Sequence, residues 1–181
     1  MQTIKNNTNK GIYVYGSFIN EENKLLGIEP EELDDLKESF NCILIEADGS
    51  KKKSLKAWNE YEPVVYNMTT KTIGVLSLKA FGMEINNENI HRLKEFIDLT
   101  KCEVNEKVNL DILIKIIFSE NGLFKNSKGE KILFINRVDL VTDDILEILI
   151  EKIIYKNNKV RLLSKIIYGS LKEKYLKCIK L

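Results

Sequence analysis

A carboxylate, a glycine and several lysines follow a short apolar run near residue 45, and these residue types could bind a phosphate with its magnesium ion. Asp48 could hold Mg²⁺ directly or through water. Gly49 would let the backbone approach a phosphate, and Ser50, Lys51 and Lys56 are the candidates to contact it or offset its charge. The alternative is an acidic strand end followed by a solvated basic loop, since Asp-Gly is a common turn pair.

A second stretch, Asn-Arg-Val-Asp at residues 136–139, has the residue types that read a guanine base. Asp139 can accept hydrogen bonds from the N1–H and the exocyclic amine, while Asn136 can brace the loop and reach N7. The planar guanidinium of Arg137 can stack over the base. The pattern resembles the N-K-x-D element of GTP-binding proteins, with arginine in place of lysine. Alternatively, Asp139 caps the turn before the next helix and Asn136 closes the strand end.

Other reactive residue types show no strong pattern. His91 has no Cys or His partner at metal-ligand spacing, and we expect it at the surface or boundary of a helix. Trp58 is expected to anchor a loop. The three cysteines have no metal-ligand spacing and are expected as reduced thiols, with Cys42 in a core strand. The sequence contains no G-x-x-x-x-G-K-[ST], G-x-S-x-G or H-E-x-x-H motif. We therefore expect poor affinity for triphosphates.

The elements that position these residues follow from the apolar pattern. Apolar β-branched runs predict strands, and stripes with helical spacing predict helices. The segment 47–70 has no periodicity, and a connection of this length is usually functional. The final twelve residues fit either a helix or an edge strand. Strands are expected at 11–19, 42–47, 72–78, 131–140 and 159–167, and helices at 29–40, 87–99, 109–122 and 142–158.

Strands that alternate with helices predict an α/β fold with a mostly parallel sheet and flanking helices. We expect one domain over residues 1–181, since this length suits a single core. Ligands of such sheets bind outside the carboxyl ends of the strands. The stretch after residue 47 and the Asn-Arg-Val-Asp loop are therefore expected on one rim.

Composition excludes some classes of function. Lys and Arg total 28 against 27 Asp and Glu, so the formal net charge is +1 and no general basic field is available for nucleic acid or an anionic membrane. The N-terminal residues are polar and do not form a signal peptide. We expect a cytoplasmic protein that binds neither nucleic acid nor membrane.

Most of the chain, from about residue 24 to residue 140, also resembles a known family, most strongly in the segment that begins at residue 46. Glu46, Asp48, Gly49 and Ser50 fall in an E-A-D-G-S run, which is followed by a lysine, an E-P pair and a His-Arg pair. The sequence is thereby similar to the YqeC-type accessory proteins of selenium-dependent molybdenum hydroxylases. The matching positions further along the chain are Lys56, Glu62, Pro63, His91 and Arg92.

The resemblance implies a P-loop-NTPase-like fold, a role in maturing a molybdenum hydroxylase, and a partner that is this enzyme or its maturation machinery. GTP or ATP with Mg²⁺ would be the cofactor. Trp58, Tyr61 and Arg137 depart from the residues usual in the family. The family's glycine-rich phosphate loop is expected upstream of Met1 or lost. A non-hydrolysing scaffold with a degenerate NTPase fold, and a nucleotidyl- or sulfur-transfer enzyme acting on a pterin, remain as alternatives.

Overall fold

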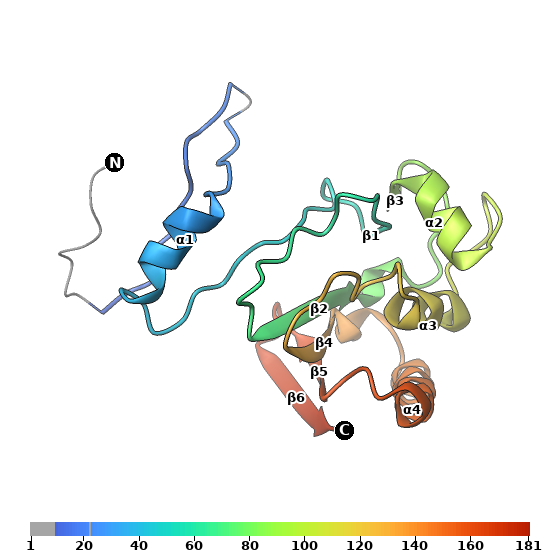
Figure 1. Ribbon diagram of the computed structural model, residues 1–181. Helices are drawn as coiled ribbons and strands as arrows, with labels where there is room; N and C mark the ends of the chain where they lie inside the picture. The colour runs from blue at the N-terminus through green and yellow to red at the C-terminus, as the bar shows by residue number, and fades with distance from the viewer. Residues whose placement is uncertain (1–9, 22) are drawn as a thin grey trace. The chain divides into compact units, whose positions relative to one another are not determined.

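The computed structural model in Figure 1 describes residues 10–21 and 23–181. The chain divides into two compact units, Met1–Glu46 and Ala47–Leu181. We call them the N-terminal and the C-terminal unit. The expectation of no signal peptide rests on the polar residues at the N-terminus, and most of these lie outside the described residues. The expectation of one domain over residues 1–181 stays a prediction.

The N-terminal unit contains helix α1 (Pro30–Lys37), which confirms the helix predicted there. Proline suits the first position of a helix, because its missing N–H would have no partner there anyway. The backbone N–H of Glu29 donates to the carboxylate of Glu32 at 3.2 Å. Leu33 is buried. The helix ends at Lys37 rather than at residue 40.

The strands predicted at 11–19 and 42–47 are wrong. Val14 and Leu44 are each 85% exposed, and Cys42 is exposed rather than in a core strand. An apolar extended segment becomes a strand only where a neighbour satisfies its backbone groups. Within the described part of this unit, residues 17–21 and 23–26 are joined by an isolated bridge between Ile19 and Leu25, and 42–46 pair with no strand.

The C-terminal unit contains a four-stranded sheet in the order β2-β4-β5-β6. Strands β2 (Lys71–Ser77), β4 (Glu130–Asn136) and β5 (Lys165–Ser170) are parallel, and β6 (Tyr175–Lys180) joins β5 in the antiparallel sense. The α/β class and the mostly parallel sheet are thereby confirmed. The tail is an edge strand. The P-loop-NTPase-like arrangement stays a prediction.

Helices α2 (Leu93–Thr100), α3 (Leu110–Phe118) and α4 (Asp143–Val160) lie to one side of these strands (Figure 1). They bury one face of the sheet in a continuous apolar core, whereas the opposite face leaves Ile73 and Val75 about half exposed. Members of the core from strands and helices include Leu76, Leu133, Ile135, Ile166, Phe96, Leu113, Ile117, Leu149 and Ile153.

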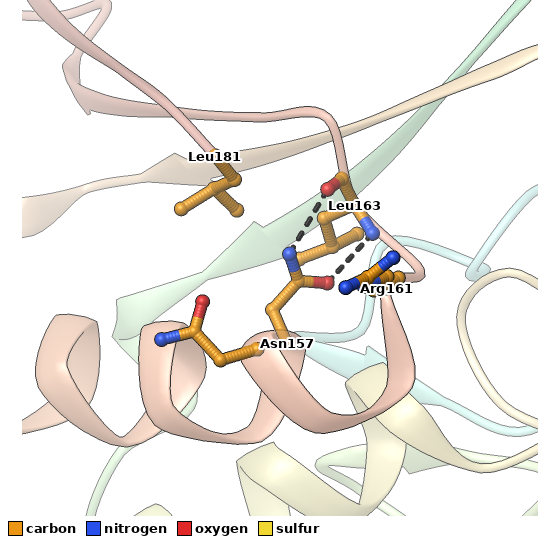
Figure 2. Close-up of a pocket in the computed structure, with 5 residues that line it drawn as sticks. Asn157, Arg161, Leu163 and Leu181 are labelled. Atoms are coloured by element: carbon orange, nitrogen blue, oxygen red, sulfur yellow. Dashed lines mark hydrogen bonds between the residues drawn. The ribbon is translucent and has the colours of Figure 1, made fainter.

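One buried amide closes the connection from α4 to β5 (Figure 2). Asn157 is 5% exposed; its Nδ2 donates to the carbonyl of Leu163 at 3.0 Å, and its Oδ1 accepts from the backbone N–H of Leu163 at 2.8 Å. A pocket of about 420 Å³ lies beside this clamp, lined in part by Arg161 and Leu181. Because α4 continues to Val160, β5 starts six residues later than the strand predicted at 159.

A second, two-stranded sheet was not expected. β1 (Leu55–Lys56) lies inside the segment predicted as a connection, and β3 (Ile90–His91) lies inside the segment predicted as a helix from residue 87. The helix α2 begins only at Leu93. Within residues 10–21 and 23–181, no helix is both long and apolar enough to cross a membrane.

Candidate functional site

The parallel pairing of β1 with β3 brings together residues that are far apart in the sequence. Leu55 lies opposite Ile90, and Lys56 lies opposite His91. Leu55 and Ile90 are buried in the apolar core, which fixes the two short strands. The polar residues next to them, Lys56 and the His91–Arg92 pair, are thereby held at the edge of that core.

Lys56 is the centre of an ion-pair network. Its side chain is 8% exposed, and its Nζ lies 2.8 Å from Oδ2 of Asp48 and 3.2 Å from Oε2 of Glu62. The ammonium also donates to the carbonyl of Gly49 at 3.0 Å. Burial of an ammonium is costly unless it is paired, so these three acceptors are what allow Lys56 to be buried.

Trp58 supports the same carboxylate. Its indole Nε1 donates to Oδ2 of Asp48, and its ring centroid lies 5.8 Å from the ammonium of Lys56. The side chain is 8% exposed and belongs to the core cluster. Trp58 therefore anchors the loop, as predicted, and it also holds Asp48, which the sequence did not indicate.

Glu62 and Arg92 form the second half of the network. Arg92 donates from Nε to Oε2 at 2.9 Å and from a terminal nitrogen to Oε1 at 2.7 Å, which is the paired geometry that suits a guanidinium and a carboxylate. The hydrogen bond from Arg92, with a smaller contribution from Lys56, lowers the pKa of Glu62 to about 2. Glu62 is thus ionised at neutral pH and joins the two cations.

The basic turn after Gly49 is fixed to β3. Within the turn, the Ser50 hydroxyl donates to the carbonyl of Lys53 at 3.0 Å, and the Lys53 backbone N–H donates to the carbonyl of Ser50 at 3.0 Å. The side-chain ammonium of Lys53 donates to the carbonyl of Ile90 at 3.2 Å and also to that of Asn87. The turn therefore lies against the strand that carries His91.

His91 lies beside several cations. It is partly buried, and it is on β3 rather than on the predicted helix. Burial lowers the pKa of its imidazole, and the charges of Arg92, Lys56 and Lys51 lower it further. The imidazole is therefore neutral at pH 7, in the state in which it can accept a proton.

The arrangement around Asp48 disfavours the predicted magnesium ion. The carboxylate oxygen Oδ2 is occupied by Lys56 and Trp58, and an ammonium 2.8 Å away repels a second cation. Among the described residues, no group of three or more His, Cys, Asp or Glu side chains gathers as a metal site. Magnesium at Asp48 stays a prediction.

The Asn-Arg-Val-Asp loop follows β4 and is braced by its asparagine, as the motif suggested. Asn136 Oδ1 accepts from the backbone N–H of Arg137 at 2.8 Å and from that of Leu171 at 3.3 Å. It thereby joins the carboxyl ends of β4 and β5. A hydrogen bond from Ser170 is the main cause that lowers the pKa of Asp139, whose Oδ1 lies 3.6 Å from Arg137 Nε.

The two stretches do not both follow strands at one rim of the sheet, as was expected. The Asn-Arg-Val-Asp loop is at the carboxyl end of a sheet strand, but Asp48 is not, because 42–47 is not a strand. Hydrogen bonds and ion pairs of the described residues join the network to itself and not to Asn136 or Asp139. Glu46 is exposed in the N-terminal unit.

Two further contacts of the segment 47–70 were not predicted. The ammonium of Lys125 donates to the carbonyl of Asn59, and the amide of Asn126 donates to the carbonyl of Pro63 at 3.3 Å. Both donors come from the segment before β4, more than sixty residues away in the sequence. No motif connects these positions, since each acceptor is a backbone carbonyl that any residue offers.

These features define the class of the protein: an α/β protein with a mostly parallel sheet and a separate network of two carboxylates and two cations. The chain belongs to the YqeC family, because the family model described as YqeC protein matches residues 1–94. That range contains the whole network from Asp48 to Arg92.

A curated relative agrees with this assignment. The chain is 33% identical over 129 residues to the uncharacterized protein YqeC of Escherichia coli strain K12. The alignment covers 69% of this chain and 50% of that protein, so the chain spans about half the length of the relative. No solved structure matches the chain.

Proposed function

We propose that this YqeC-family protein is an accessory factor in the maturation of selenium-dependent molybdenum hydroxylases, and that its action is linked to nucleotide binding. The observation that carries the proposal is the convergence of the motif residues. Asp48, Lys56, Glu62 and Arg92, which carry the resemblance to these accessory proteins, form one network although they span more than forty positions.

The nucleotide base would bind at the loop after β4. Asn136 joins this loop to the end of β5, and the carboxyl ends of parallel strands are the usual ligand sites of α/β sheets. The hydrogen bond that lowers the pKa of Asp139 keeps its carboxylate ionised at neutral pH. An ionised carboxylate accepts both hydrogen bonds that guanine offers, whereas adenine has neither donor at these positions.

A binding scaffold that hydrolyses nothing is the second candidate. The observation that favours it is the pairing of Asp48, because an oxygen already bound by Lys56 and Trp58 is poorly placed to follow a magnesium-bound phosphate. In this function the network fixes the loop as a partner surface and carries out no chemistry.

Thermal unfolding with GDP or ADP, each with Mg²⁺, separates these two functions. A nucleotide at a hundred times its dissociation constant stabilises a protein by about 2.7 kcal/mol. We expect a rise in Tm of several degrees with GDP and a smaller rise with ADP. No rise in Tm with either nucleotide, together with no heat of binding, would support the binding scaffold instead. Binding of GTP without phosphate release would support a scaffold that senses nucleotide.

The client enzyme is tested by deleting the gene and assaying a selenium-dependent molybdenum hydroxylase in extracts. We expect the activity to fall on deletion and to return with the wild-type gene. Rescue by wild type but not by Asp139→Asn would support the link to nucleotide. Unchanged hydroxylase activity in the deletion strain would refute the accessory role.

A further inference from the structure

The basic turn and the His91–Arg92 pair carry more positive charge than the carboxylates of the network neutralise. Within the network, Lys56 and Arg92 offset Asp48 and Glu62. Lys51 has no counterpart: among the hydrogen bonds and ion pairs of the described residues, its ammonium takes part in none. A surplus of positive charge therefore remains on the basic turn.

The basic turn is fixed at two points, one on each side of Lys51. The carbonyl of Gly49 accepts from Lys56 at 3.0 Å, and the ammonium of Lys53 donates to the carbonyl of Ile90 at 3.2 Å. The start and the end of the turn are therefore bound to β1 and β3. Lys51 lies between these two anchors with a φ of 51°, a left-handed conformation that few non-glycine residues adopt. Its side chain is exposed, and it lies two residues before Lys53, whose ammonium binds the strand of His91.

Arg92 has N–H groups that its pairing with Glu62 does not occupy. A guanidinium carries five N–H groups, and the pairing with Glu62 uses the one on Nε and one on a terminal nitrogen. Its side chain is 25% exposed, so part of the guanidinium faces solvent. Glu62 holds this group in one orientation. The remaining N–H groups are thus directed before any ligand arrives, which lowers the entropic cost of binding.

From this arrangement we propose that Lys51, His91 and Arg92 form a binding site for a phosphate group. Lys51 supplies an unpaired charge, Arg92 supplies directed N–H donors, and the imidazole of His91 supplies one more donor once it is protonated. The site differs from the earlier expectation, in which Lys56 would contact phosphate, because the ammonium of Lys56 is already bound to Asp48 and Glu62. The inference goes beyond the proposed function and does not require the base site at Asp139.

The proposal predicts a coupling between anion binding and the protonation of His91. The charged groups around this imidazole are Lys51 on the turn, Lys56 on β1, and Arg92 with its partner Glu62. In the free protein the cations oppose protonation. A bound phosphate anion offsets them and favours it, so phosphate should bind more tightly as His91 becomes protonated. Each unit by which the pKa rises corresponds to about tenfold tighter binding to the protonated form.

His91 is the one histidine of the sequence, so its imidazole signal in an NMR spectrum needs no assignment. The experiment is a pH titration of this signal in the full chain with inorganic phosphate, compared with chloride at the same ionic strength. We expect the pKa of His91 to lie below 6.5 in chloride and to rise by roughly half a unit or more in phosphate. Equal values in phosphate and chloride would overturn the proposal.

Two variants of the same turn give a matched control. Lys51→Gln and Lys52→Gln each remove one exposed charge, but only Lys51 is among the cations that lower the pKa of His91. We expect Lys51→Gln to remove most of the effect of phosphate and Lys52→Gln to retain it. Equal losses in both variants would mean that phosphate acts through the general charge of the turn, and the specific site would be refuted.

The source of the phosphate group is distinguished by repeating the titration with GDP. An effect of GDP that disappears in Asp139→Asn would identify the phosphate of a nucleotide whose base is bound after β4. An effect that is the same in Asp139→Asn, and is matched by inorganic phosphate, would identify a separate phosphate ligand. Both results support the site, whereas absence of any response to either anion contradicts it.

Discussion

Replacing Lys56 by methionine tests whether the ion-pair network stabilises the fold. Methionine has a similar length, and its flexible unbranched chain can fill the space of an 8% exposed side chain, so the change removes the charge with little change in packing. Two carboxylates then lose a cation. Removing one partner of a buried ion pair costs about 3–5 kcal/mol. Asp48 is 22% exposed and keeps Trp58, and Glu62 is 24% exposed and keeps Arg92, so we expect a smaller loss of about 2 kcal/mol.

Urea unfolding followed by tryptophan fluorescence measures this loss directly. Trp58 is the one tryptophan of the sequence, and its indole donates to Asp48 within the network. For a chain of this size, about 2 kcal/mol corresponds to a fall in Tm of roughly 4–8 °C. The midpoint of unfolding should move to lower urea concentration while the slope stays the same.

The matched control is Lys152→Met. The ammonium of Lys152 lies 2.9 Å from the carboxylate of Asp111, but the two side chains are 45% and 75% exposed. Such surface pairs contribute about 0–1 kcal/mol. We expect little change in the control. If Lys56→Met lost no more stability than Lys152→Met, the network would be a surface feature and our reasoning about its burial would be wrong.

Three further predictions concern single side chains. Because the pKa of Glu62 is lowered from 4.5 to about 2, its ionised form stabilises the folded state above pH 4.5, and this contribution is lost as the pH falls towards 2. Glu62→Gln should therefore flatten the acid side of a plot of unfolding free energy against pH, and an unchanged slope would contradict the pairing with Arg92. Asp139→Asn should weaken GDP and improve XDP, whose 2-oxo group can accept from the new amide; the loss of a hydrogen bond to the base is about 1–3 kcal/mol, or roughly 5- to 150-fold in a calorimetric titration. Asn157→Ala should lower the unfolding free energy by about 2 kcal/mol in urea, because the N–H and the carbonyl of Leu163 would both lose a buried partner.

The sheet of the C-terminal unit was predictable because its strands are continuous apolar runs. The run at 72–78 and the run that begins at 131 become β2 and β4, which pair in register from Lys71 with Glu130 to Ser77 with Asn136. The run at 42–47 also begins with consecutive apolar residues but forms no strand. An apolar composition indicates that a segment can form a strand, but the segment becomes one only if it pairs with a neighbouring strand.

The candidate site was predictable in its members and not in its geometry. The resemblance named Asp48, Lys56, Glu62 and Arg92, but their contacts depend on the pairing of β1 with β3, two strands of two residues each. Strands this short leave no periodic signal. The helical spacing of α2 also extends through residues 90 and 91, so the sequence predicts His91 on a helix, whereas it lies on β3.

The pairing of Glu62 with Arg92 has a consequence for the order in which the chain folds. The two residues are thirty positions apart, so the salt bridge closes a large loop and must wait for the second partner. While the protein is being synthesised, the segment from Asp48 to Glu62 leaves the ribosome with both carboxylates but without the arginine that orients one of them. A nascent chain that stops short of residue 92 should therefore expose Trp58 to quenchers and proteases, and the segment should become protected only when Arg92 has emerged.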